Sequence, residues 1–334
     1  MTTPTWVTLH DIASSLDAPL EQVTKAILGQ PGVSDDFRQR VFGALEQAGI
    51  VPVSRENTMT GTIAVVIPGA VVGDYIGEVV RGTNAAAEKN GCALALHIEN
   101  AAKEEDVVRL LESPTCLGMI LVVPNNYEAL LALCEQYNRE YVLVDHQEDD
   151  VPDNVLTVEV KNRESIVQVM NMLFDLGHRR IGFITGRLEV ASARQRLQGY
   201  EDALASAGIP FDPLLVAEGD WLHPRAYAMA QVLLNLEEPP TAIVASNDLS
   251  AFGAMQAAVE RGLVVGKDIS ITGFDDIDMA ATVTPSLTTM RQPMFRMGET
   301  AVEMLIKRSR GEKVSRRHVR FDAELILRQS TSAP

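Results

Sequence analysis

Residues 241–255, TAIVASNDLSAFGAM, are the stretch that decides the fold of this chain. The first six residues are apolar or small, as in a strand that is buried on both faces, and Asn247 and Asp248 follow at once. Helical periodicity then continues over residues 249–262. A buried strand, polar residues at its end and a helix together form the repeating unit of a parallel sheet that helices cover on both faces.

The same unit recurs on both sides of this stretch, in two series. Short β-branched runs that predict strands occur at 63–67, 92–97, 117–123 and 141–145, and again at 181–185, 214–220, 241–246 and 269–274. Helical patterns occur at 75–90, 126–138, 192–207, 224–236 and 249–262. The sequence therefore predicts two similar α/β lobes with parallel doubly wound sheets and a ligand-binding cleft between them.

The first fifty residues differ, because they have helical periodicity only. Apolar residues recur every three or four positions in three short segments, and Thr8 and Ser34 stand at two of the predicted helix starts. The following stretch, 51–62, is rich in Thr, Ser, Pro and Gly, as linkers are. We expect a small all-α domain over 1–50 and a linker over 51–62.

Composition limits the possible partners. The chain has 334 residues, of which 46% are hydrophobic and 22% charged, as in globular proteins. Its formal charge of −16 excludes a general attraction to nucleic acid or to an anionic membrane, so any DNA contact must be local. Three cysteines without CxxC spacing predict reduced thiols, and neither a signal peptide nor an apolar run of about 18 residues occurs. These features favour a cytoplasmic protein with no membrane partner.

Motifs of the common enzyme classes do not occur in the sequence. There is no Gly-x-Gly-x-x-Gly turn, Walker A loop, HExxH helix or Gly-x-Ser-x-Gly elbow, and the six histidines lack metal-ligand spacing. We therefore expect no enzyme activity, no metal and no cofactor. Asp145, Asn247 and Asp275 end predicted strands and could exchange paired hydrogen bonds with adjacent hydroxyls, although Asn247 could equally cap the helix after it.

Six segments carry a resemblance to a known family, in matching order and distance. They are VTLHDIA at 7–13, LGHRRIGFITG at 176–186, SARQRLQGYEDAL at 192–204, ASNDLSAFGAM at 245–255, DISITGFDD at 268–276 and PSLTTMRQP at 285–293. Together they resemble the lactose-repressor family of bacterial transcription regulators over nearly the whole chain.

The resemblance implies a helix-turn-helix headpiece and a hinge in front of a core like that of the type I periplasmic binding proteins. Three strands would cross between the two lobes of this core, near Val160, Met290 and Asp322. The lobe boundaries that follow are residues 63–160 with 291–321 for lobe 1, and residues 161–290 with 322–331 for lobe 2.

Several positions match residues that bind the effector in this family. Arg196 matches an arginine that grips hydroxyls or carboxylates, and Asn247 and Asp275 match polar residues that bond sugar hydroxyls. Trp221 stands where some sugar-binding members place an aromatic ring, with a structural aromatic as the alternative. Arg196 and Asp275 are expected to line the cleft without belonging to the core. The full set of expected effector-binding residues is Tyr75, Asp145, Arg196, Trp221, Asn247 and Asp275.

The headpiece departs from the family at its second helix. Asp17 replaces the turn glycine, Pro19 replaces the phosphate-binding Ser or Thr, and the first base-reading positions are Leu20 and Glu21. Residues 1–57 carry four basic and seven acidic side chains, a net charge of −3, whereas DNA affinity depends largely on neutralising phosphates. The expected DNA-contacting residues are Thr8, Leu20, Glu21, Lys25 and Arg55.

The resemblance also implies a homodimer formed through lobe 1. Helices near 75–89 and 103–112 are expected at its interface, where Val107, Leu110 and Leu111 offer an apolar stripe. A basic run near the end of the chain is expected to face solvent. It comprises Lys307, Arg308, Arg310, Lys313, Arg316, Arg317 and Arg320.

The sequence thus predicts an effector-responsive, DNA-binding transcription regulator, in this family commonly a repressor, that senses a small hydroxylated molecule such as a sugar. Purine-binding members share the fold. The alternative is a ligand sensor of the same fold that has lost operator binding and acts through a protein partner. An enzyme or a transport-associated binding protein is disfavoured, because catalytic motifs and a signal peptide do not occur.

We predict that Glu21→Gln combined with Asp17→Gly raises the affinity for operator DNA, because both changes remove negative charge and restore family residues. With about 3 phosphates neutralised per headpiece, the slope of log affinity against log salt should be about −5 to −6 for a dimer. Gel-shift titrations at several salt concentrations measure both quantities. Nanomolar binding of the unmodified protein to the usual family palindrome in physiological salt would contradict the prediction.

Overall fold

A computed structural model describes residues 9–27, 32–47, 61–69, 73–99, 104–124, 127–146 and 151–334. Two compact units, residues 1–60 and 61–334, divide the chain. Of the expected DNA-contacting residues, Thr8 and Arg55 lie outside the described residues, as does most of the predicted linker. The first core strand begins at Gly61, two residues before the predicted start.

The first unit contains the three predicted helices, α1 (Leu9–Ser15), α2 (Leu20–Ile27) and α3 (Asp35–Gln47). The helices pack through a small apolar cluster of Ile12, Ala13, Val23, Ala26, Val41 and Leu45. Ser34 caps α3 as predicted, because its hydroxyl accepts a hydrogen bond from the Phe37 amide at 3.3 Å.

The turn between α1 and α2 has a backbone conformation that suits glycine. Asp17 has a φ of 50°, in the left-handed region that glycine adopts without steric cost. On α2, Lys25 donates to Glu21 one helical turn earlier at 2.6 Å, so the two charges neutralise each other on the surface. Leu20 is 39% exposed at the start of the helix. The helix that would read DNA therefore presents an apolar residue and an ion pair.

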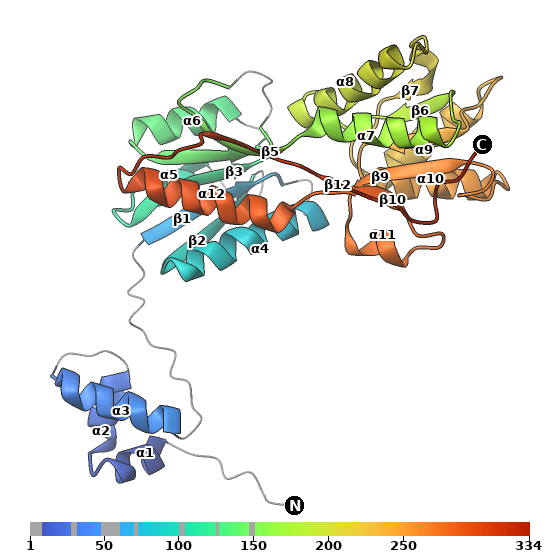
Figure 1. Ribbon diagram of the computed structural model, residues 1–334. Helices are drawn as coiled ribbons and strands as arrows, with labels where there is room; N and C mark the ends of the chain where they lie inside the picture. The colour runs from blue at the N-terminus through green and yellow to red at the C-terminus, as the bar shows by residue number, and fades with distance from the viewer. Residues whose placement is uncertain are drawn as a thin grey trace, which may run out of the picture. The chain divides into compact units, whose positions relative to one another are not determined.

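Lobe 1 is built on a six-stranded parallel sheet in the order β11-β5-β4-β3-β1-β2. Its strands are β1 (Gly61–Ile67), β2 (Cys92–Ile98), β3 (Cys116–Val122), β4 (Glu140–Val144), β5 (Leu156–Val160) and β11 (His318–Phe321). Helices α4 (Asp74–Lys89) and α12 (Met294–Ser309) cover one face, and α5 (Glu104–Glu112) and α6 (Tyr127–Gln136) the other (Figure 1).

Lobe 2 repeats this arrangement with the order β12-β10-β9-β8-β6-β7, in which only β12 is antiparallel to its neighbour. Its strands are β6 (Ile181–Ile184), β7 (Val216–Ala217), β8 (Ala242–Ala245), β9 (Ser270–Asp275), β10 (Thr288–Arg291) and β12 (Glu324–Ile326). Its helices are α7 (Asn162–Asp175), α8 (Ala191–Ser206), α9 (His223–Leu234), α10 (Asp248–Glu260) and the short α11 (Asp278–Thr282).

The strand patterns follow from burial on both faces. In β1, Ile63 and Val65 face α4 and α12, whereas Ala64 and Val66 face α5 and α6, because successive strand residues point to opposite faces. Both sets must be apolar, so the strand appears in the sequence as one continuous hydrophobic run. The predicted fold class, an all-α headpiece with a two-lobed α/β core, is confirmed.

The chain crosses between the lobes three times. It leaves lobe 1 after β5, returns from β10 to α12, and passes from β11 to β12 (Figure 1). These passages follow Val160, Arg291 and Phe321, close to the three expected positions.

Two local expectations are wrong. The stretch 214–220 is not one strand. The Asp212 side chain accepts a hydrogen bond from the Leu214 amide at 3.0 Å and so starts a 3₁₀ turn, η1 (Pro213–Leu215). Only the two-residue strand β7 remains of the predicted strand. The expected interface stripe is unavailable, because Val107 and Leu111 are buried in the core of lobe 1.

The basic run faces solvent as expected: six of its seven side chains are exposed and Arg308 is half-buried, although three of them also make contacts. Arg308 reaches Glu140 at 3.1 Å, Arg317 donates to the Asp153 carbonyl at 3.2 Å, and Arg320 pairs with Glu159 at 2.5 Å. Part of this run therefore holds lobe 1 and the crossing strand β11 together. In the part of the chain that the structure describes, no helix has the length and apolarity to cross a membrane.

We predict that Gly82→Ala destabilises the core by about 2 kcal/mol or more, as overpacking does. A Cβ at Gly82 would lie 1.9 Å from the Phe295 carbonyl oxygen, because α4 and α12 touch backbone to backbone. Gly77 in the same helix has no neighbour within 4 Å, so Gly77→Ala serves as the control and should be neutral or stabilising by up to about 1 kcal/mol. Urea unfolding followed by circular dichroism measures both, and equal stabilities would contradict this account of the contact.

Candidate functional site

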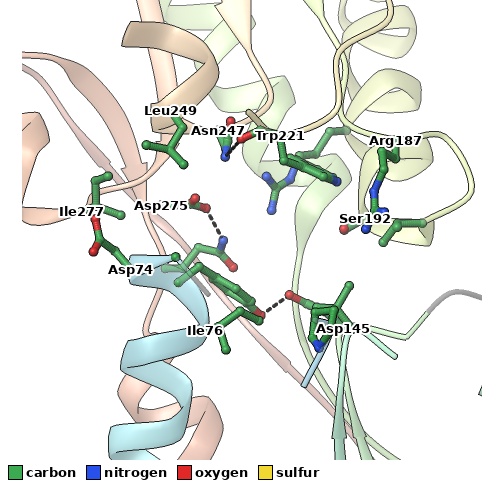
Figure 2. A pocket seen from close by; sticks show the side chains of 17 residues that line it. Asp74, Ile76, Asp145, Arg187, Ser192, Trp221, Asn247, Leu249, Asp275 and Ile277 are labelled. Atoms are coloured by element: carbon green, nitrogen blue, oxygen red, sulfur yellow. Dashed lines mark hydrogen bonds between the residues drawn. The ribbon is translucent and has the colours of Figure 1, made fainter. Parts of the chain in front are cut away.

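A cavity of about 90 Å³ lies between the lobes and is lined from both. Its volume is several times the roughly 10–15 Å³ that one water molecule requires, so it can admit a small organic molecule. Figure 2 shows side chains converging on it from the strand ends of the two sheets. All six residues expected from the sequence line this one cavity: Tyr75, Asp145, Arg196, Trp221, Asn247 and Asp275.

The lobe 1 wall is formed by Tyr75 and Asp145. Tyr75 lies in the first turn of α4, and its hydroxyl donates to Asp145 Oδ2 (Figure 2). Asp145 follows β4 directly with a φ of 49°, which turns the chain out of the sheet. Burial raises the pKa of Asp145, while the Tyr75 hydrogen bond and the Arg196 charge oppose the shift. The Oδ1 atom of Asp145 is buried and has no partner among the described residues.

Arg196 of α8 is the centre of the lobe 2 wall. Its Nε donates to Asn162 Oδ1 at 2.8 Å, and its Nη1 donates to the Ser246 carbonyl. The guanidinium carbon lies 3.6 Å from the centroid of the Phe274 ring and 5.2 Å from that of the Trp221 ring. Burial lowers the pKa of Arg196, and the charges of Asp275 and Asp145 act against this.

These contacts correct one expectation. Arg196 is only 2% exposed and Asp275 only 7%, so both belong to the packed interior as well as to the cavity wall. Truncating Arg196 would leave a carbonyl and an amide oxygen buried without their donor, at a cost of about 1–3 kcal/mol for each. Arg196 is therefore as much a structural residue as a candidate ligand contact.

Trp221 is held in an unusual conformation. Its φ is 72°, which is rare for a bulky residue, and Asn247 Nδ2 donates to its carbonyl at 3.0 Å. The indole ring lies against Gly186, where a Cβ would be 2.1 Å from the nearest ring atom. The ring thus needs a glycine at position 186, and it is partly buried while it also lines the cavity.

Asn247 caps α10, as one of its two expected roles requires, and it also lies in the cavity wall. Its Oδ1 accepts the hydrogen bond from the Ser250 amide at 2.9 Å that forms this cap. Its neighbour Asp248 does not line the cavity, because its carboxylate accepts from the Ile277 amide at 2.9 Å and the Thr289 hydroxyl at 2.5 Å. The two adjacent residues therefore have different functions, one at the cavity and one in the core.

The same division holds at the end of β9. Asp275 lines the cavity and accepts from Gln292 Nε2 at 2.7 Å, whereas Asp276 is paired with Arg291 at 2.7 Å and Arg328 at 2.6 Å. Burial raises the pKa of Asp275 to about 7, although Arg196 and Gln292 act against the shift and Asp145 adds to it.

Sequence reasoning missed several lining residues. Arg187 lies in the loop after β6, three residues beyond Ile184, so a search for polar residues directly at the strand ends does not reach it. Ser192 and Gln292 lie inside the quoted family segments but were not singled out. The apolar part of the wall could not be recognised, because its members look like any core residues; it comprises Ile76, Val123, Val190, Leu249 and Ile277.

Three buried polar atoms of this wall have no hydrogen-bond partner among the described residues: Asp145 Oδ1, Arg187 Nε and Gln292 Oε1. Buried polar groups are almost always bonded, so these atoms offer hydrogen bonds to water or to a ligand in the cavity. Within the described residues, no group of three or more His, Cys, Asp or Glu side chains is placed to hold a metal ion.

Two lobes joined by three crossings around a cavity with charged and apolar walls, preceded in the sequence by a three-helix unit, define a ligand-binding protein of the periplasmic-binding-protein type joined to a headpiece. A family model described as a periplasmic binding protein-like domain matches residues 170–331. The HTH-type transcriptional repressor CytR of Escherichia coli (strain K12) is 31% identical, with 98% of this chain and 97% of that protein covered. The chain belongs to the lactose-repressor family of transcription regulators.

Solved structures agree with this assignment. The transcriptional regulator CelR in complex with cellobiose matches with a TM-score of 0.76 at 26% identity, over 97% of this chain and 100% of that chain. The lac repressor dimer bound to operator and the anti-inducer ONPF matches with a TM-score of 0.74 at 25% identity, over 98% of this chain and 99% of that chain. The likeness therefore extends over headpiece and core together.

We predict that Asp275 makes the ligand-free protein less stable as the pH rises. Its pKa is about 7 in the folded state against 3.8 when unperturbed, so the folded protein retains a proton that the unfolded chain has lost. The free energy of unfolding should therefore fall between about pH 4 and pH 7 and change no further above that. Asp275→Asn removes this contribution, so the free energy of unfolding of the variant should rise relative to that of the wild type between about pH 4 and pH 7. Urea unfolding at several pH values measures this difference. A difference that does not change with pH would contradict the prediction.

Proposed function

We propose that this protein is an effector-responsive transcription repressor whose interlobe cavity binds a small hydroxylated molecule such as a sugar. The observation that carries the proposal is the convergence of all six expected residues on a cavity with unpartnered polar atoms. Family membership supplies the regulatory context, and a regulator of similar structure carries cellobiose.

The geometry suggests how the effector acts. Asp145 belongs to lobe 1, while Arg196, Trp221 and Asp275 belong to lobe 2, so a ligand bonded to both walls favours a closed arrangement. The three crossings are the only connections of chain between the lobes within residues 151–334 and must carry any such movement. We propose that closure of the two cores in a homodimer repositions the paired headpieces on operator DNA. The effector shifts the population towards the closed state because it binds that state more tightly than the open one.

Operator binding should be weaker than in relatives with basic headpieces. Lys25 is already neutralised by Glu21 at 2.6 Å, and Pro19 has no amide N–H to offer to a phosphate. Leu20 and Glu21 lack the donor pairs that read purines, although Glu21 could accept from a cytosine amino group. The operator should therefore differ from the usual family half-site.

The same observations favour a second candidate function. A ligand sensor whose headpiece contacts a protein partner needs no phosphate neutralisation, and the exposed Leu20 beside an ion pair suits a protein surface. Gel shifts of the full-length protein on its own upstream DNA separate the two functions. Binding that an effector modulates supports the repressor, whereas ligand binding without any DNA binding supports the sensor.

We predict that Asp275→Ala lowers effector affinity by about 30- to 1000-fold. A polar group of the ligand would be buried without a hydrogen-bond partner, which costs about 2–4 kcal/mol of binding free energy. Asp202→Ala is the matched control, since Asp202 is on the solvent side of α8 in an ion pair with Arg163. A thermal-shift panel of sugars and nucleosides finds the ligand, and calorimetry then compares the variants. Equal affinities would place the effector elsewhere.

A further inference from the structure

Acceptor atoms dominate the unsatisfied side of the cavity wall. Asp145 Oδ1 and Gln292 Oε1 are buried without partners, and neither can donate while Asp145 is ionised. The two carboxylates already act as acceptors, Asp145 from the Tyr75 hydroxyl and Asp275 from Gln292 Nε2 at 2.7 Å. A ligand that satisfies this wall must bring hydrogen-bond donors.

Negative charge faces the cavity from both lobes. Asp145 follows β4 in lobe 1, Asp275 ends β9 in lobe 2, and Asp74 starts α4 at the cavity edge (Figure 2). An anion between Asp145 and Asp275 would meet like charge on two opposite sides in a poorly solvated space, where juxtaposed like charges cost several kcal/mol. Closing the lobes would bring these charges nearer to it.

The cations of the wall offset this only in part. Arg196 has two of its nitrogens engaged by Asn162 and Ser246, and its guanidinium lies near two aromatic rings. Its charge is therefore already placed against Phe274 and Trp221. Arg187, whose Nε has no partner among the described residues, is the cation best placed to attract an anion.

We propose that this cavity selects ligands that are rich in hydrogen-bond donors and carry no negative charge, and rejects their phosphorylated and carboxylated counterparts. Adjacent hydroxyls or an amine can bond Asp145 and Asp275 together, while a phosphate cannot. The proposal rests on the proposed function and names the chemical class of its effector.

The first test compares matched pairs on the full-length protein at pH 8, above the pKa of about 7 of Asp275. The pairs are ribose and ribose 5-phosphate, glucose and gluconate, cytidine and its monophosphate, and adenosine and its monophosphate, with glucosamine as the amine. Any uncharged or amine compound that binds should bind at least about 100-fold more tightly than its anionic counterpart, because charge repulsion in the cavity weakens binding of the anion by about that factor. Tighter binding of an anionic member overturns the proposal, and its loss in Arg187→Gln would show where the anion sits.

The second test needs no effector, because Trp221 lies in the cavity wall. In a Trp6→Phe background, quenching of Trp221 fluorescence by iodide is compared with quenching by neutral acrylamide. Asp145→Asn with Asp275→Asn should raise iodide quenching several-fold and leave acrylamide quenching unchanged. Asp153→Asn with Asp202→Asn makes the same change in net charge away from the cavity and should alter neither.

The outcomes separate the proposal from the function on which it rests. If iodide quenching does not respond to the cavity carboxylates, the selectivity proposal fails even when a sugar binds and modulates DNA binding. If no ligand of the panel binds but iodide is excluded through Asp145 and Asp275, the selectivity stands and the choice of a sugar as effector fails.

Discussion

A buried guanidinium that lies against two aromatic rings and donates to two segments of backbone and side chain is the feature on which the ligand side of lobe 2 depends. Arg196 joins the helix α8 to Asn162, next to the first crossing, and to the carbonyl of Ser246 at the end of β8. The rings of Phe274 in β9 and of Trp221 in the loop before α9 lie 3.6 and 5.2 Å from its guanidinium carbon. One side chain thus fixes four segments that are far apart in the sequence. A lysine could not do this, because it lacks the planar fork that donates in several directions and stacks on rings.

The positive charge of Arg196 has to be balanced by nearby negative charge. A buried cation is costly unless opposite charge is close, and Asp275 and Asp145 supply that charge from the two lobes. The compensation is incomplete for the carboxylates, whose pKa values are raised by burial. The ligand-free cavity therefore holds polar groups that are poorly satisfied by the protein itself. In the proposed function, a donor-rich ligand improves this balance and so links binding energy to closure of the two lobes.

The headpiece shows how a fold can persist while its surface chemistry changes. Ile12, Val23, Val41 and Leu45 form the apolar cluster that three packed helices need, and Asp17 occupies the left-handed turn despite its side chain. The outward face of α2 instead carries Leu20 and the Glu21–Lys25 pair. Packing depends on the inward positions alone, so the outward ones are free to adopt charges that suit a different DNA sequence or a different partner.

The sequence by itself determined the alternation of strands and helices, because strands buried on both faces leave continuous apolar runs that chain periodicity reveals. It also indicated Asp145, Asn247 and Asp275, since the carboxyl ends of parallel strands share one edge. Only the tertiary structure decided which of two adjacent strand-end residues reaches the cavity. Asn247 and Asp275 line it while Asp248 and Asp276 are bonded inside the lobe. That choice depends on backbone angles at the strand ends and on partners 15 to 52 positions away, such as Arg328 for Asp276, which no local pattern encodes.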